Sequence, residues 1–236
     1  MILCCGEALI DMIPTPTITA SDGFVPHAGG AVFNTAIALG RLGVQTGMLT
    51  GLSTDMFGQQ LAAQLAASKV DTSLIVTSDR PTTLAFVQLT NGHASYSFFD
   101  ENSAGRMLEP SDMPNLPSTV TALYFGGISL ACEPGADAYA AVLKHYGENR
   151  AVMIDPNIRP SFIKYEARYR ARLDGMLRRA DIVKVSDEDL DWIVQAELTQ
   201  REKVAALLDM GVSLVVLTKG GDGATGYLSG GEEVSV

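Results

Sequence analysis

The residues best suited to chemistry in the first part of the chain are a carboxylate, a glycine pair and an amide. Asp11 is a lone acid within the apolar segment 8–13, and Gly29 and Gly30 are followed by Asn34. A carboxylate removed from water is costly unless it is paired, and ligand hydroxyls are suitable partners. The glycines allow a ligand close to the backbone, and the Asn34 amide both donates and accepts. The spacing favours a site for a polyhydroxylated ligand, with N–H groups at the start of the following helix as further donors.

A purely structural interpretation of the same residues stays open. Glycine pairs are common before helices, so Gly29 and Gly30 can form a tight loop with Asn34 as the helix cap. Asp11 can equally be a residue at a strand end that faces water.

A second polar group follows the apolar segment 152–154. Asp155, Asn157 and Arg159 share a short run with two prolines, which leave it little conformational freedom to lose on binding. The guanidinium of Arg159 can make a forked contact with a phosphate or a carboxylate. The alternative is a turn in which the Asp and Asn side chains bond their own backbone.

Two later runs also end in polar residues. Lys184 and Ser186 follow apolar positions, and Asp189 comes three residues after Ser186, which is close to a helix capping box. A capping role and a ligand-binding role are equally compatible with this pattern. The apolar run from 214 ends in a glycine-rich turn, whose candidate ligand-binding residues are Thr218, Lys219, Gly220 and Gly223.

Strand-like apolar runs alternate with amphipathic helical patterns along the chain. Strands are predicted at 2–5, 46–49, 122–125, 152–154, 182–185 and 214–218, and helices at 34–42, 57–67, 136–146, 162–179, 187–194 and 201–210. This alternation is typical of a mostly parallel sheet with helices on both faces. Ligands bind beyond the carboxyl ends of the strands in such sheets, and the polar residues of the last three runs are expected just after strands.

One region departs from the alternation. Segments 83–90 and 94–99 have a period of two around Asn91-Gly92, a pair that favours a type I′ hairpin. Together with about 8–27, the region at about 83–100 predicts a small sheet over the glycine pair, with Phe98 closing on the ligand. An ordinary surface hairpin is the alternative, but its apolar side chains need a surface to pack against.

Composition limits the classes of function. The chain has 236 residues and is 47% hydrophobic, so it can bury the core of one large domain. Its formal net charge of −10 makes it a poor partner for nucleic acid or anionic membranes. The basic residues from 159 to 179 are interrupted by acids, which predicts a solvated helix face for all of them except Arg159. No apolar run reaches the ~18 residues of a membrane span. The first cation is Arg41, so a secretory leader is not expected, and the three cysteines are expected to be reduced in the cytoplasm.

The motifs together resemble the ribokinase-like (PfkB) carbohydrate kinases. The likeness is carried by Gly6-Glu7-Ala8-Leu9-Ile10-Asp11, by Gly29-Gly30 with Asn34, and by Leu42-Gly43 with the segment 51–58 around Asp55. Within the family the sequence is most similar to bacterial fructokinases. The resemblance implies an α/β chain with the ribokinase-like three-layer α/β/α fold, a mostly parallel central sheet and a small β-sheet lid. It also implies transfer of the ATP γ-phosphoryl group to a primary sugar hydroxyl, converting D-fructose to fructose 6-phosphate.

The resemblance also implies roles for particular residues. The sugar is expected to contact Asp11, Gly29, Gly30, Asn34, Phe98 and Arg159, with Arg159 supporting the transferred phosphate as well. The nucleotide is expected to contact Asn157, Lys184, Ser186, Thr218, Lys219, Gly220 and Gly223. The implied cofactors are ATP and Mg²⁺, which Asp189 would meet through a water molecule, with K⁺ as a further candidate. Family lids often clasp a second subunit, so a homodimer through the lid is expected.

Two departures from the family pattern matter. Ribokinases proper carry a lysine between the glycine pair and the asparagine, where this chain has 31–33 as Ala-Val-Phe, which argues against ribose. The family's Gly-Ala-Gly-Asp signature does not occur in residues 1–236. We therefore expect one domain corresponding to roughly the first three quarters of a kinase, with the catalytic base beyond Val236 and little or no phosphate transfer by a protein ending there.

Three hypotheses therefore remain open at the level of sequence. They are a fructokinase, a kinase for a 2-keto-3-deoxygluconate-type acid or another PfkB sugar, and a truncated sugar-binding protein without chemistry. The acidic lid segment 97–103 disfavours an acidic sugar.

Overall fold

The computed structural model describes residues 1–19, 21–90 and 93–236. The predicted turn at Asn91-Gly92 lies outside these described residues. The central sheet has the strand order β15-β14-β13-β12-β11-β10-β1-β4-β6. Its strands are β1 (Ile2–Cys5), β4 (Thr46–Leu49), β6 (Val70–Asp71), β10 (Ala122–Gly126), β11 (Ala151–Asp155), β12 (Ile182–Ser186), β13 (Leu214–Thr218), β14 (Ala224–Leu228) and β15 (Glu233–Ser235). Neighbours from β6 to β13 pair in parallel, whereas β14 and β15 are antiparallel.

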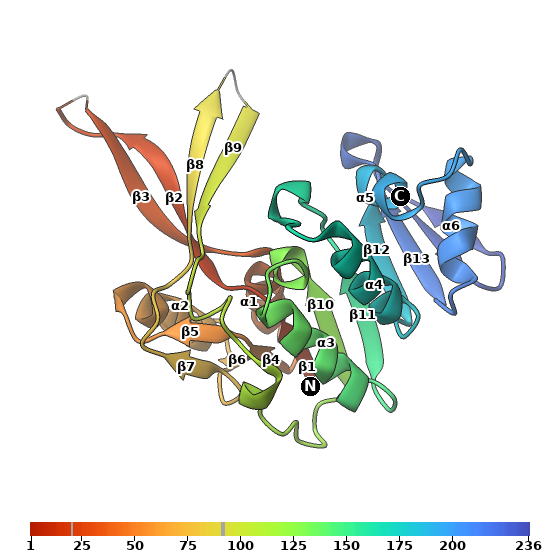
Figure 1. Ribbon diagram of the computed structural model, residues 1–236, viewed down its shortest axis with the longest axis horizontal. Coiled ribbons are helices and arrows are strands. Elements are labelled where there is room, and N and C mark those ends of the chain that lie inside the picture. The colour runs from red at the N-terminus through yellow and green to blue at the C-terminus, as the bar shows by residue number, and fades with distance from the viewer. Residues whose placement is uncertain (20, 91–92) are drawn as a thin grey trace.

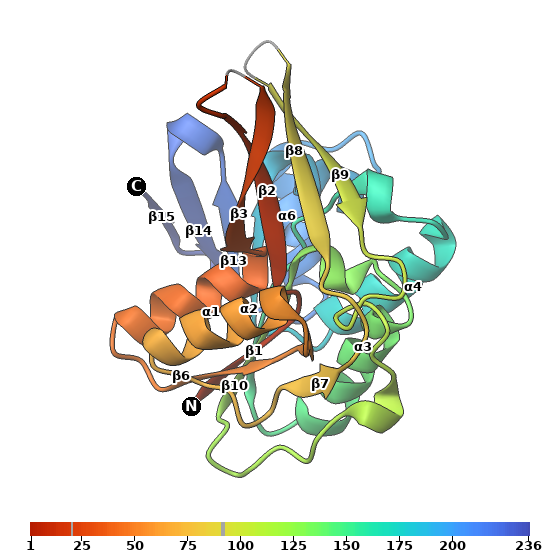
Figure 2. The ribbon, with the colours of Figure 1, turned by 90° about the vertical axis from the view of Figure 1, so that its left-hand side faces the viewer.

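Helices cover both faces of the sheet (Figure 2). On one face lie α1 (Ala31–Arg41) and α2 (Met56–Ala67), and on the other lie α3 (Gly135–Tyr146), α4 (Glu166–Leu177), α5 (Asp187–Ile193) and α6 (Gln200–Leu208). Successive strand residues alternate between the two hydrophobic cores, because neighbouring side chains of a strand point to opposite faces. In β1, for example, Leu3 and Cys5 pack towards α3 and α4, and Cys4 packs towards α1 and α2. The predicted three-layer fold is confirmed.

A second sheet stands away from the central one and forms the lid (Figure 1). Its strand order is β3-β2-β8-β9, with β2 (Leu9–Pro16), β3 (Asp22–Gly29), β8 (Leu84–Thr90) and β9 (His93–Phe99). Two short strands, β5 (Gly51–Ser53) and β7 (Val76–Ser78), pair below it. Turns of 3₁₀ helix occur at η1 (Pro110–Asp112), η2 (Gly127–Leu130), η3 (Pro160–Phe162) and η4 (Gly220–Asp222).

Several sequence predictions need correction. Helix α1 begins at Ala31, three residues before the predicted start, and α4 begins at Glu166 because Pro160 starts a separate turn, η3. Asp155, Ser186 and Thr218 are the last residues of their strands and do not follow them.

The arginine-rich helix α4 is also less solvated than the charge pattern predicts. The Arg172 side chain is only 6% exposed and is ion-paired with Glu133 and Asp137 of the α3 region. The guanidinium of Arg170 stacks on the Trp192 ring at 3.6 Å. These arginines therefore join neighbouring helices. Among the described residues, no helix is long and apolar enough to cross a bilayer.

Candidate functional site

A cavity of about 530 Å³ lies between the lid and the carboxyl ends of the central strands. Residues from five separate segments of the chain line it: Glu7, Leu9, Asp11, Gly30, Ala31, Asn34, Tyr96, Phe98, Gly127, Ile128, Asn157, Arg159, Ser161 and Phe162. The structure thus brings together Asp11, Gly30, Asn34, Phe98, Asn157 and Arg159, which sequence reasoning had singled out separately. Polar groups converge on a partly apolar wall, which is the usual composition of a small-molecule site.

Asp11 lies within strand β2, on the face of the lid that looks into the cavity. It pairs across the strands with His27 and Ala85 and is half-buried. Burial raises the pKa of Asp11, and the nearby His27 opposes that shift. A Cβ on Gly29 would lie 2.1 Å from Asp11 Oδ2, so the first glycine of the pair makes room for this carboxylate. Gly29 does not itself line the cavity.

The raised pKa of Asp11 leads to a prediction about pH. If the ionised carboxylate accepts ligand hydroxyls, ligand affinity falls as pH drops towards the ordinary carboxyl range, because protonation removes the acceptor charge. The effect on folding has the opposite sign: a carboxyl whose pKa is raised in the folded state favours folding at low pH and loses that contribution as pH rises through the raised value. Calorimetric titration of sugar from pH 7 downward is the measurement. A pH-independent affinity would contradict the role of Asp11, and Asp11→Asn should remove the dependence.

Glu7 holds the beginning of helix α1. Its Oε1 accepts hydrogen bonds from Ala31 N at 2.9 Å and Val32 N at 3.4 Å, and its backbone oxygen accepts from Phe33 N at 3.2 Å. The first-turn N–H groups are therefore already bonded, and the expectation that they serve as free donors to a ligand is wrong. Asn34 is not the cap either; it is the fourth residue of the helix, exposed, and it lines the cavity.

The same carboxylate also joins a second segment. Glu7 Oε2 accepts from Ser129 N at 3.3 Å, and a Cβ on Gly127 would lie 2.1 Å from Oε1. Gly127 has φ +68°, a conformation that favours glycine. Burial raises the pKa of Glu7, although the hydrogen bonds from Ser129 and Val32 oppose the shift. Sequence reasoning quoted Glu7 within a motif without giving it a role, because its partner in η2 is more than a hundred positions away.

The loop between β11 and η3 is held by Asp189. Its Oδ1 accepts from Ile158 N at 2.8 Å, and its Oδ2 accepts from Ser186 N at 3.2 Å, while Ser186 Oγ accepts from Asp189 N. The capping box is thus present at the start of α5. It fixes the loop that presents Asn157, which has φ +44°, and Arg159 to the cavity.

A half-buried ion pair lies beside this loop. Lys184 Nζ is 3.2 Å from Asp155 Oδ2, and Asp155 Oδ1 is buried without a hydrogen-bond partner among the described residues. Burial raises the pKa of Asp155, and the Lys184 ammonium opposes the shift. The Lys184 ammonium is suited to a phosphate group, and the unpaired Asp155 oxygen is suited to a metal ion bound with that phosphate. Within the described part of the chain, no group of three His, Cys, Asp or Glu residues forms a ready metal site.

The ion pair gives a second prediction. Lys184→Met leaves Asp155 without its cation, and we expect a loss of about 1–3 kcal/mol in the free energy of unfolding. Removing one partner of a fully buried ion pair costs more stability than this, but the Lys184 side chain is 28% exposed and solvent reduces the loss. Urea unfolding measures the change. Lys144→Met, at an exposed position of α3, is the matched control, and the double variant with Asp155→Asn should recover most of the loss. Equal stability of Lys184→Met and the control would show that the pair contributes nothing.

The glycine-rich turn lies at the same edge of the sheet but outside the 530 Å³ cavity. Thr218 pairs with Ser186 across β13 and β12, and Lys219 N donates to Gly223 O at 2.9 Å. Gly220 and Gly223 have φ +55° and +87°. Most of the predicted site residues thus divide between the cavity and a separate group at the ends of β12 and β13, which consists of Lys184, Ser186, Thr218, Lys219, Gly220 and Gly223. Gly29 and Asp189 belong to neither set, because Gly29 makes room for Asp11 and Asp189 holds the loop after β11.

The fold and the cavity define a class: α/β proteins that bind a small polar ligand between a parallel sheet and a β-sheet lid. Comparisons with known proteins identify the family within it. The family model for pfkB family carbohydrate kinases matches residues 1–236. A fructokinase from Rhizobium leguminosarum bv. trifolii is 51% identical over 229 residues, which cover 96% of this chain and 69% of that protein. This chain belongs to the pfkB family of carbohydrate kinases.

Solved structures agree in fold over the whole chain. The crystal structure of a fructokinase with bound ATP from Xylella fastidiosa has a TM-score of 0.89 at 28% identity, and the match covers 100% of this chain and 76% of that one. A fructokinase double mutant from Vibrio cholerae O395, in a form with fructose, ADP and potassium ion bound, has a TM-score of 0.86 at 25% identity and is covered to 74%. The predicted family and the predicted class of enzyme are confirmed.

Proposed function

We propose that this chain is a fructokinase and that the 530 Å³ cavity binds D-fructose for phosphorylation at its 6-hydroxyl by ATP. The observation that carries the proposal is the convergence of Asp11 from the lid and Asn34 from helix α1 on one cavity. A carboxylate acceptor and an amide can together bind several hydroxyls of one sugar. The 51% identity to the Rhizobium leguminosarum fructokinase supports fructose as that sugar.

Phosphoryl transfer needs mainly positioning and charge stabilisation. In the proposal, Asp11, Gly30, Asn34 and Phe98 orient the sugar, and Gly29 contributes only by making room for the Asp11 side chain. The nucleotide contacts Asn157, Lys184, Ser186, Thr218, Lys219, Gly220 and Gly223. Arg159 lines the cavity, and its guanidinium makes one hydrogen bond to the described residues, from Nη1 to Ile158 O. The guanidinium can therefore also meet the negative charge of the moving phosphoryl group. As the sugar oxygen bonds to the γ-phosphorus, the bond to the ADP oxygen breaks and the hydroxyl proton passes to a base. No residue of 1–236 is assigned as that base.

Cofactors complete the proposal. Mg²⁺ supplies charge neutralisation on the phosphates when bound, with Asp189 acting through a water molecule because backbone N–H groups already bond its two oxygens. K⁺ is a further candidate ion. We also place the protein in the cytoplasm.

A sugar-binding panel tests this proposal. Isothermal titration of the chain with D-fructose, D-ribose, D-glucose and 2-keto-3-deoxygluconate should give the tightest binding for fructose. The charged side chains lining the cavity are Glu7, Asp11 and Arg159, two acids and one base, which disfavours an acidic sugar. Tighter binding of the acid or of ribose would overturn the choice of fructose, and no binding of any sugar would overturn the proposal as a whole.

The lid supports a further proposal, a homodimer. On its outer face the rings of Phe24, Phe86 and Phe99 form an edge-to-face row with centroid distances of 5.0 and 5.4 Å. Phe24 is 46% exposed and Phe99 62%. Exposed apolar rows of this kind mark association surfaces. We expect Phe99→Ser to shift the sedimentation mass from dimer towards monomer, and a wild-type protein that sediments as a monomer at all concentrations would contradict the proposal.

A further inference from the structure

Two aromatic rings from different parts of the fold meet at the rim of the sugar cavity. Phe98 belongs to lid strand β9, and Phe162 ends the turn η3 that follows β11. Their rings are in edge-to-face contact, with centroids 4.4 Å apart and an interplanar angle of 76°. Tyr96 stacks beside Phe98 at 5.9 Å. Because edge-to-face pairs are attractive beyond their buried area, this contact joins the lid to the main body.

A second cavity, of about 610 Å³, lies on the other side of this ring pair. Tyr96, Phe98, Ser161 and Phe162 line both cavities, so these four residues form the wall between them. Among the residues that the structure describes, no other lines both cavities. The two spaces would merge if the wall lost one of its rings.

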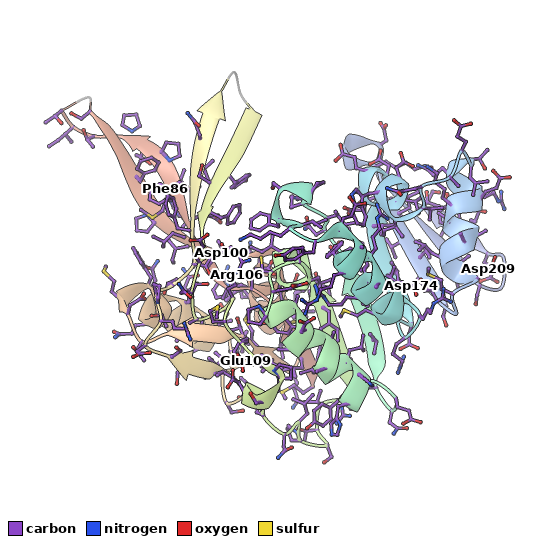
Figure 3. All side chains as sticks on the ribbon, in the orientation of Figure 1. Phe86, Asp100, Arg106, Glu109, Asp174 and Asp209 are labelled. Carbon is purple, nitrogen blue, oxygen red and sulfur yellow. The ribbon has the colours of Figure 1, made fainter. Side chains whose placement is uncertain are left out.

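The second cavity is polar enough to accept a hydroxylated group. Its lining includes Thr82, Glu101 and Lys164, together with the ion pair of Asp100 and Arg106. Figure 3 shows this pair at the base of the lid. Hydroxyls and charged groups of this kind are suitable hydrogen-bond partners for a second sugar ring.

The backbone that carries Phe162 is held at several points. Pro160 starts η3, and Phe162 N donates to Arg159 O at 2.9 Å. The preceding loop is tied to Asp189 through Ile158 N. Both rings line the sugar cavity, but Phe98 belongs to the lid and Phe162 to the main body.

We propose that Phe162 is a specificity-determining residue that limits the ligand to a single sugar ring, because its side chain closes the sugar cavity against the adjoining polar cavity. This inference rests on the proposed fructose site. Removing the ring joins the two cavities and admits a disaccharide whose second ring occupies the 610 Å³ space. The Leu variant retains much of the bulk and keeps the wall.

The test is a comparison of affinities by isothermal titration with the chain as it exists. The ligands are D-fructose and two disaccharides, turanose and trehalulose, in which glucose is joined to fructose away from the 6-hydroxyl. We expect wild type and Phe162→Leu to bind fructose at least about 50-fold more tightly than either disaccharide, and Phe162→Ala to reduce that ratio about 10-fold for at least one of them. Phe162→Val serves as a second opened variant, and thermal melting confirms that each variant is folded.

The outcomes separate the two proposals. Wild type that binds no fructose overturns the proposed function. The second outcome is that wild type binds fructose, but the folded Phe162→Ala and Phe162→Val variants have the same ratio of fructose to disaccharide affinity as Phe162→Leu. That result leaves the fructose site in place and overturns the role of Phe162. Wild type that already binds the disaccharides as well as fructose also overturns it.

Discussion

Asp11→Asn should weaken fructose binding about 100-fold, which corresponds to about 2.7 kcal/mol. The substitution keeps the size of the side chain in the space that Gly29 leaves for it, so packing is preserved while the negative charge is lost. Hydrogen bonds to a charged group contribute about 1.5–3 kcal/mol each, so the loss of one or two such bonds accounts for the effect. Isothermal titration with fructose gives the affinity directly.

The controls for this variant use distant groups. Asp209→Asn removes an exposed carboxylate beyond the end of α6, on the opposite side of the molecule from the lid base (Figure 3), and should leave fructose affinity unchanged. Binding of ATP should also be unchanged in Asp11→Asn, because all of the nucleotide candidates except Asn157 lie outside the cavity that Asp11 lines. An Asp11→Asn protein that binds fructose within about threefold of wild type would show that the lid carboxylate is not a ligand, since charge-assisted bonds are worth more than that.

Parts of this site could be predicted from local sequence because their signals are local. Strand β1 has the predicted bounds, since its four residues are apolar and end at a glycine. Asp11 was found as an isolated acid among apolar neighbours, and Asn34 as an amide after two glycines. Their presence in one cavity follows once the lid is placed over the carboxyl ends of the strands.

Other parts could not be predicted because they depend on contacts between distant segments. Gly29 accommodates the Asp11 side chain, which only the pairing of β2 with β3 reveals. The sequence pattern predicts that the helix begins at 162, but Phe162 ends the separate turn η3 and lies in the wall of the cavity. The sequence predicts a solvent-exposed charge at Arg172, because its partners Glu133 and Asp137 lie more than thirty positions away in the α3 region.

Glu7 is the strongest example of a role set by tertiary structure, and it carries the second large effect. We expect Glu7→Ala to lower the free energy of unfolding by about 3 kcal/mol and to weaken fructose binding about 10-fold. The substitution removes the acceptor for Ala31 N, Val32 N and Ser129 N. Each buried donor left unpaired costs about 1–3 kcal/mol, and water from the adjoining cavity can reach some of them, which keeps the total at the lower end. Urea unfolding and sugar titration measure the two losses.

Glu109→Ala is the matched control because Glu109 also accepts a backbone N–H, at the exposed turn η1, and its removal should cost about 1 kcal/mol or less. Glu7→Gln distinguishes the hydrogen bonds that Glu7 makes to helix α1 from the one that it makes to Ser129. Its amide oxygen can still accept from Ala31 and Val32, whereas its NH₂ group meets the N–H of Ser129, so its stability should fall between those of wild type and Glu7→Ala.

The pH dependence of stability distinguishes the charge of Glu7 from its shape. Because the pKa of Glu7 is raised in the folded state, wild type loses stability relative to Glu7→Gln as pH rises through that raised value. A difference that stays constant with pH would mean that Glu7 keeps an ordinary pKa in the folded protein. If Glu7→Ala matched Glu109→Ala in stability and bound fructose as wild type does, helix α1 and η2 would be positioned without the carboxylate, and Asn34 would owe its place in the cavity to core packing alone.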